Sequence, residues 1–197
     1  MATAFDFLWT AFIFFFDVRV GGFDVLPDVV GYLLLAIGLW RIASLDRHLA
    51  VAARLAPFTA MLSLADIYCP PTKGSSLVTF GGPTFQTPLG IALVAVTIVL
   101  TALNVIIVHQ MLVGLMTAAK KKKETKVANA ATSLLGEYKA LHGVLAALVL
   151  LSAAVPTIVW IGSLTQYAVG FITYIPMMSF LRDTQWYLFG MREKAST

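Results

Sequence analysis

The amino-acid sequence predicts an all-α integral membrane protein, a bundle of six transmembrane helices with both the N-terminus and the C-terminus in the cytoplasm. Three observations predict this class. Apolar residues make up 59% of the 197 residues and charged residues only 12%, whereas about one quarter of the residues in soluble domains are charged. The apolar residues fall into six long stretches, and nearly all basic residues fall on one side of the membrane when these stretches are treated as spans.

A helix that spans a bilayer needs roughly 20 apolar residues, and the six stretches differ in how closely they match this length. The first is short, and Gly21, Gly22 and Pro27 separate it from the second, which suits a tight turn or a broken helix, with a re-entrant hairpin as the main alternative. The fourth is longer than a bilayer requires, so its inner end is expected to enter the interface. The spans are placed at 4–20, 25–43, 49–67, 88–118, 140–161 and 165–181 of a single domain, 1–197, with an external loop at 68–87 and a basic cytoplasmic loop at 119–127.

The distribution of basic residues sets the predicted orientation. With both termini in the cytoplasm, Arg19 and Lys73 are the only two of the 14 Lys and Arg residues outside. Cytoplasmic loops carry an excess of Lys and Arg, so an even number of spans with both ends inside is favoured. Tyr138 is expected near the inner interface, where aromatic residues are enriched. The single cysteine, Cys69, excludes an intramolecular disulfide and a thiolate zinc cluster.

The densest group of polar residues is expected at the outer interface, around the boundary of the first two spans and the end of the third. Ionisable groups near membrane depth are costly and are usually paired or functional. Such a cluster would bind a hard cation or hold a proton. The structural alternative is that Asp24 caps the second helix and Asp28 interacts with its positive end. The candidate ion-binding or ligand-binding residues are Asp17, Arg19, Asp24, Asp28, Tyr32 and Asp66, and the identity of any metal is left open.

Polar residues also recur at helical spacing within the spans, which predicts a polar seam between helices that leads inward from the acidic cluster. Helix packing is the competing interpretation, because small and hydroxyl residues let membrane helices approach and hydrogen-bond. Packing explains Ser and Thr better than it explains Asp6 and Asn104. The seam residues are Asp6, Thr10, Ser63, Thr101, Asn104, Gln166 and Thr173.

Four consecutive lysines, Lys120, Lys121, Lys122 and Lys123, form the centre of the basic loop. They are expected to contact anionic lipid headgroups at the inner face or a protein partner. A role as a stop-transfer and orientation signal alone is the simpler alternative. The expected partners are therefore the lipid bilayer and a protein partner or a second copy of the chain, and no nucleic acid is expected.

Common catalytic and cofactor-binding motifs are absent from the sequence. There is no HExxH, GxSxG, GxxxxGK[ST] or GxGxxG pattern, so enzymatic activity is unsupported and no cofactor other than a bound cation is expected. The leading hypothesis is a small transporter or permease-like protein that holds a cation or proton at the acidic cluster. The alternatives are a non-catalytic accessory or scaffold subunit and a membrane-embedded enzyme that modifies lipid.

The segment FDVRVGGFDVLPDVVGYLLLAIGLWRIA, residues 16–43, resembles the N-terminal region of small polytopic membrane proteins of Gram-positive bacteria. The resemblance rests on an Asp-x-Arg, a Phe-Asp and a Leu-Pro-Asp that precede Gly-Tyr, and it covers roughly the first quarter of the chain. It implies the plasma membrane of a bacterium and draws attention to Asp17, Asp24 and Asp28. It implies no activity.

Overall fold

The structure is a computed structural model that describes residues 3–16, 19–20, 23–67, 78–79, 88–154 and 159–189. Helices account for most of the described residues, and short 3-10 turns extend the first three of them. The α-helices are α1 (Ala4–Ala11), α2 (Asp28–Ile42), α3 (Arg47–Ser63), α4 (Pro88–Lys121), α5 (Thr125–Ala154) and α6 (Val159–Phe189), and the 3-10 turns are η1 (Phe12–Phe15), η2 (Ala43–Leu45) and η3 (Leu64–Asp66).

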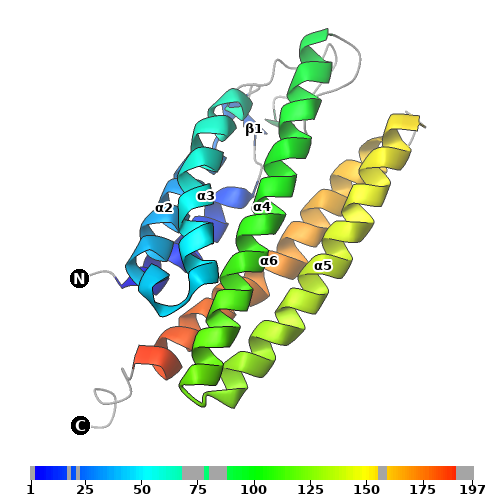
Figure 1. Cartoon of the computed structure of the whole chain (residues 1–197). Coiled ribbons are helices and arrows are strands. Elements are labelled where there is room, and N and C mark those ends of the chain that lie inside the picture. The colour runs from blue at the N-terminus through cyan, green and yellow to red at the C-terminus, as the bar shows by residue number, and fades with distance from the viewer. Residues whose placement is uncertain are drawn as a thin grey trace.

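The six helices of the described residues form a closed ring in sequence order. Each helix packs against the next, and α1 packs against α6 as well as α2, so the last helix returns to the first. Figure 1 shows α2 and α3 on one side of α4, with α5 and α6 on its other side. The prediction of an all-α bundle of six helices is therefore confirmed.

The second half of the bundle is built from longer helices than the first. Helices α4, α5 and α6 contain 34, 30 and 31 residues, whereas α2 and α3 contain 15 and 17. At 1.5 Å per residue, α4 is about 50 Å long and α2 about 22 Å. In Figure 1, α4 extends beyond the upper end of α3.

The first helix is shorter than the predicted 4–20 segment. Helical backbone continues only through Phe15, because Phe16 adopts an extended conformation with φ −86° and ψ 107°. The chain then forms a hairpin of β1 (Arg19–Val20) and β2 (Phe23–Asp24), and β3 (Val78–Thr79) joins the free edge of β1. The external loop predicted at 68–87 lies outside the described residues except for this two-residue strand.

Two helices among the described residues are long and apolar enough to cross a membrane, Asp28–Leu45 and Ile98–Lys121. The segment Ala4–Phe15 is a shorter apolar helix. Its residues Phe5, Leu8, Ala11, Phe12 and Phe15 are buried. They pack into the interior of the ring.

Most of the segment predicted as a loop, 119–127, is helical, and only a tight turn at 122–124 connects α4 to α5. The backbone N–H of Glu124 donates to the carbonyl of Ala119 at 2.9 Å, and that of Lys123 donates to Lys120 at 3.1 Å. This pair of bonds is the Schellman motif, which normally places glycine in the left-handed conformation just after the helix. Here Lys123 occupies that position with φ 62°.

Candidate functional site

The outer acidic cluster is described only in part. Asp17 lies outside the described residues, and the side chains of Arg19 and Asp66 are likewise not described. The backbone nevertheless brings three of the predicted residues together. Arg19 lies directly opposite Asp24 in the hairpin, and the Asp24 N–H donates to the carbonyl of Ile67, next to Asp66, at 3.0 Å. The hairpin is thus attached to the end of η3.

The two aspartates whose side chains are described occupy local structural positions. Asp24 Oδ1 accepts a hydrogen bond from the backbone N–H of Leu26 at 3.0 Å, which stabilises the turn before α2. Asp28 lies in the first turn of α2, where the helix dipole favours a carboxylate. Among the residues whose side chains are described, no three His, Cys, Asp or Glu residues come close enough to hold a metal ion.

Tyr32 lies one helical turn after Asp28 and is buried in an aromatic cluster. Its ring centroid is 4.8 Å from that of Phe15, and Phe15 lies 6.0 Å from Tyr174 of α6. Phe12 and Phe16 also contact Tyr174, at 5.5 and 5.8 Å between centroids. These rings join η1, α2 and α6, so Tyr32 belongs to the packed core beneath the hairpin.

Two of the predicted seam residues make hydrogen bonds within their own helix. The Ser63 hydroxyl donates to the Ala60 carbonyl at 2.9 Å, and the Thr173 hydroxyl donates to Val169 at 2.6 Å. Thr10 is half-buried on α1 and Thr101 is exposed on α4, while the side chain of Gln166 lies outside the described part of the chain. For Ser63 and Thr173, packing with local hydrogen bonding is a sufficient explanation.

Asp6 forms a capping box with Thr3 at the start of α1. The Thr3 backbone N–H donates to Asp6 Oδ2 at 2.6 Å, and the Asp6 N–H donates to the Thr3 hydroxyl at 3.3 Å. This reciprocal pair satisfies N–H groups that a helix start leaves without partners. The role of Asp6 is thus explained at the helix end, without a seam.

Asn104 is the predicted seam residue that links different helices in the interior. Its side-chain oxygen accepts a hydrogen bond from the Tyr138 hydroxyl of α5 at 3.4 Å, and its side chain lies near that of Tyr174 of α6. Tyr138 is only 1% exposed and Tyr174 8%. The ring of Tyr138, which was expected near the inner interface, packs inside the bundle, where only its hydroxyl needs a polar partner.

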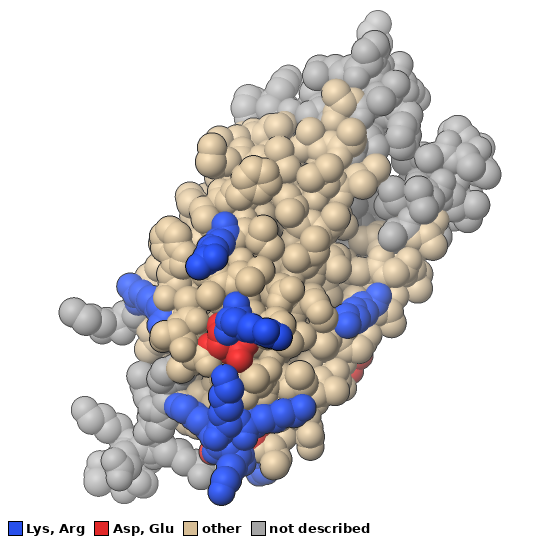
Figure 2. Space-filling view, in the orientation of Figure 1, with Lys and Arg blue, Asp and Glu red and all other residues tan. Residues whose placement is uncertain are grey.

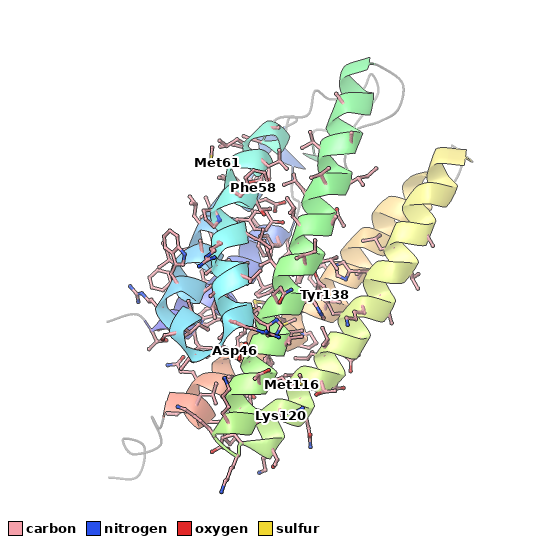
Figure 3. All side chains as sticks on the ribbon, viewed as in Figure 1. Asp46, Phe58, Met61, Met116, Lys120 and Tyr138 are labelled. Atoms are coloured by element: carbon pink, nitrogen blue, oxygen red, sulfur yellow. The ribbon has the colours of Figure 1, made fainter. Side chains whose placement is uncertain are left out.

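His142 completes this group, which we call the Asn104 cluster: Asn104, Tyr138, His142 and Tyr174. The His142 ring stacks on Tyr138 with 3.9 Å between centroids and 30° between planes. Its Nδ1 lies 3.0 Å from the Tyr138 carbonyl oxygen, to which it donates when protonated there. Figure 3 places Tyr138 between α4 and α5. From the sequence, Tyr138 was expected near an interface and neither Tyr174 nor His142 was assigned to the site, although the (i, i+4) spacing of Tyr138 and His142 on α5 was a visible signal.

A shallow groove lies between α5 and α6 beside this cluster. It is lined by Leu134, Glu137, Tyr138, Ile172, Thr173 and Met177. The groove thus brings Thr173, a predicted seam residue, and Tyr138 to the same wall.

The opposite end of the bundle contains a second set of polar contacts that the sequence analysis did not predict. His48 Nδ1 lies 2.6 Å from Gln110 Oε1, which joins α3 to α4. Within the described residues, His109 Nδ1 and Thr184 Oγ1 are buried polar atoms that make no hydrogen bond. Buried polar atoms of this kind are uncommon in native proteins, so the polar character of the interior continues below the Asn104 cluster.

Asp46 fixes the connection between α2 and α3 to the end of α4. Its carboxylate caps α3 through the His48 N–H at 3.0 Å and lies 3.2 Å from Lys121 Nζ. Burial disfavours the charged form, but the hydrogen bond from His48 and the hydrogen bond and charge of Lys121 outweigh it, so the pKa of Asp46 is lowered from its usual value. Asp46 is therefore a carboxylate at neutral pH.

No protein-family model, curated protein or solved structure matches this chain.

Proposed function

We propose that the chain is a six-span protein of a bacterial plasma membrane, with both termini in the cytoplasm, that moves a small polar solute or cation between its helices. The route begins at the acidic residues near Asp28 and passes the Asn104 cluster. The observation that carries the proposal is that Asn104 accepts a hydrogen bond from Tyr138 of α5 and lies near Tyr174 of α6, so polar groups of three helices meet. Polar side chains that converge inside a membrane bundle commonly mark a ligand or ion path.

Apolar side chains on the outside of the bundle support the membrane location. Large apolar residues are exposed on five of the helices, including Phe58 and Met61 of α3, Ile98 of α4 and Phe171 of α6. Met61 is 72% exposed, and Figure 3 shows both Phe58 and Met61 on the outer side of α3. A soluble monomer rarely exposes large contiguous apolar surface, whereas lipid tails solvate such side chains.

The charge distribution supports the proposed orientation. Figure 2 shows the Lys and Arg residues on the middle and lower parts of the visible face, most densely at the lower end where α4 meets α5, and none toward the upper end of the described surface. The lower end is therefore assigned to the cytoplasm. The hairpin and the acidic residues then lie at the outer face.

Transport is tested by reconstituting the full chain into proteoliposomes and screening cations and small polar solutes for uptake, with and without a pH gradient. Asn104→Leu removes the polar centre of the cluster at similar volume, and Asp28→Asn removes the carboxylate at the entrance. Both are expected to lower uptake at least tenfold while the protein stays folded. Ile106→Ala, an exposed position on the same helix, is the matched control and is expected to keep full uptake.

An accessory or scaffold subunit is the second candidate. The hydrogen bonds of Asp6, Ser63 and Thr173 within their own helices favour it, because these bonds serve folding and leave no need for a solute. It predicts no uptake in the screen and a stoichiometric partner after purification in mild detergent. Uptake that depends on Asn104 would exclude it, and absence of uptake across the screen would exclude transport.

A further inference from the structure

We propose that Lys120, Lys123 and Lys126, here called the lysine tip, bind the phosphate groups of anionic lipids in the cytoplasmic leaflet. The inference uses the membrane orientation proposed above and does not depend on transport. It rests on the different contacts of neighbouring lysines, on the backbone conformation of the turn and on the depth of the turn.

The lysines of the turn divide into two groups. Lys121 pairs with Asp46, and the Lys122 ammonium donates to the carbonyl of Leu188 at the end of α6. These two hold α4 to neighbouring elements. Within the described residues, by contrast, the exposed ammonium groups of the lysine tip make no hydrogen bond or ion pair. Glu124 is the one acidic residue in the turn itself, so the lysine tip keeps a net positive charge.

Lys123 occupies a position of the turn whose backbone conformation glycine would adopt more easily. Lys123 has φ 62°, a conformation that disfavours residues with a Cβ atom and that glycine adopts readily. Residues held in such conformations often serve a function that offsets the cost. At Lys123, the unfavourable backbone conformation adds a third ammonium group to the turn.

The lysines lie at or just after the end of an apolar stretch of α4, Ile98–Lys121, that is long enough to cross a membrane. Gly114 lies against Leu49 in the first turn of α3, and Lys121 follows it by seven residues, which is about 10 Å along the helix. The headgroup layer on each side of a bilayer is roughly 5 to 8 Å thick. Figure 3 shows Lys120 toward the lower end of α4, below Asp46. In the proposed orientation, the lysine tip therefore lies at the cytoplasmic end of this apolar stretch, beside the lipid headgroups.

The residue type favours lipid over an acidic protein as the partner. All three members of the lysine tip are lysines, which act as flexible point charges, whereas arginine gives the fixed bidentate geometry that specific protein sites use. The three lysines lie in the last turn of α4, in the connecting turn and in the first turn of α5. Mobile headgroups gathered around separate point charges fit this surface, and each lysine near an anionic membrane contributes about a fivefold preference.

The test compares two charge-matched double variants in nanodiscs that contain equal amounts of phosphatidylglycerol and phosphatidylcholine. K120Q/K123Q removes two charges from the lysine tip, and R54Q/K139Q removes two exposed charges from α3 and α5. The measured quantity is the ratio of the two lipids that stay bound after detergent extraction, read by mass spectrometry at low and high salt. Thermal melting confirms that each variant is folded.

The wild-type protein is expected to retain phosphatidylglycerol preferentially at low salt and to lose this preference at high salt. K120Q/K123Q should lower the preference about tenfold or more, K120R/K123R should keep it, and R54Q/K139Q should leave it close to wild type. An equal lipid ratio in wild type and K120Q/K123Q would overturn the proposal. So would an equal loss in R54Q/K139Q, because the preference would then follow total charge and not the lysine tip.

Discussion

Gly38 of α2 lies so close to α1 that a Cβ atom added to it would come 2.6 Å from Leu8 Cδ2 and 2.8 Å from the Ala4 carbonyl oxygen. Gly31, two turns earlier, would bring a Cβ atom 2.7 Å from Phe15 Cε1. The two glycines therefore let the short helix α1 pack directly on the backbone of α2, as small residues do between membrane helices.

Gly38→Ala is expected to destabilise the protein by about 1 to 3 kcal/mol, because the neighbouring backbone oxygen cannot move aside without separating the helices. The measurement is thermal or denaturant unfolding in mild detergent. Gly136→Ala is the matched control in α5, where no atom lies within 4 Å of the added Cβ. It should stabilise by roughly 0.5 to 1 kcal/mol through helix propensity, and a Gly38→Ala variant as stable as wild type would contradict the close packing.

Lys123→Gly is expected to stabilise the protein by about 1 kcal/mol, because glycine adopts the left-handed conformation of this position without a Cβ clash. Lys120→Gly, three residues earlier in the last turn of α4, should have the opposite sign and cost up to about 1 kcal/mol. Both variants remove one lysine, so charge cannot explain a difference between them. Equal melting temperatures for the two variants would argue against the Schellman turn.

Replacing Asp46 separates its capping role from its charge. Asp46→Asn keeps a good N-cap residue and loses the ion pair, which contributes less than about 1 kcal/mol because Lys121 is 63% exposed. Asp46→Ala also loses the cap and should cost about 1 to 2 kcal/mol in total. Unfolding curves at neutral pH measure both. If Asp46→Asn costs as much as Asp46→Ala, the charge outweighs the cap.

The same residue predicts a pH dependence. The pKa of Asp46 is lowered in the folded protein, whereas an unfolded aspartate has a pKa of about 3.9. The stabilising contribution is therefore fully present above the unfolded value and is lost as the pH falls through the folded value. The stability difference between wild type and Asp46→Asn should be constant from pH 7 to about 5 and shrink below about 4. A difference that grows toward low pH would reverse the assigned shift.

The Asn104 cluster predicts coupling between two positions on different helices. Tyr138→Phe should cost no more than about 1 kcal/mol, because it removes one long hydrogen bond and keeps the ring. Asn104→Ala should cost about 1 to 3 kcal/mol because it leaves the tyrosine hydroxyls without their partner. The double variant should cost less than the sum of the two, as measured by a double-mutant cycle of unfolding free energies. Strict additivity would mean that the two side chains do not interact.

The helices were predictable because their apolar stretches are long and are separated by turn residues. Helix α2 begins at Asp28, three residues after the predicted start at 25, and its N-cap is Pro27 instead of Asp24. The end of α1 and the strand β3 were not predictable. Two-residue strands carry no periodic signal, and the pairing of Arg19 with Thr79 joins segments far apart in the chain.

The candidate site was also predictable only in part. Asn104 was singled out because a carboxamide in an apolar helix has few local uses, and it does contact two other helices. Tyr138 was assigned to an interface because an aromatic residue beside Lys139 fits that pattern as well as it fits a core. Asp6 was assigned to a seam, although Thr3 three residues before it already carried the capping-box pattern.

The orientation of the six proposed spans decides which end of the bundle faces the cytoplasm, and single-cysteine labelling tests it most directly. Cys69, the only cysteine in the sequence, lies in the predicted external loop, and Lys126→Cys in a Cys69→Ser background moves the single thiol to the lysine tip. A membrane-impermeant maleimide is expected to label the wild-type protein in intact cells and to label the Lys126→Cys variant only after the membrane is opened. Labelling of the Lys126→Cys variant, but not of the wild-type protein, in intact cells would contradict the proposed orientation.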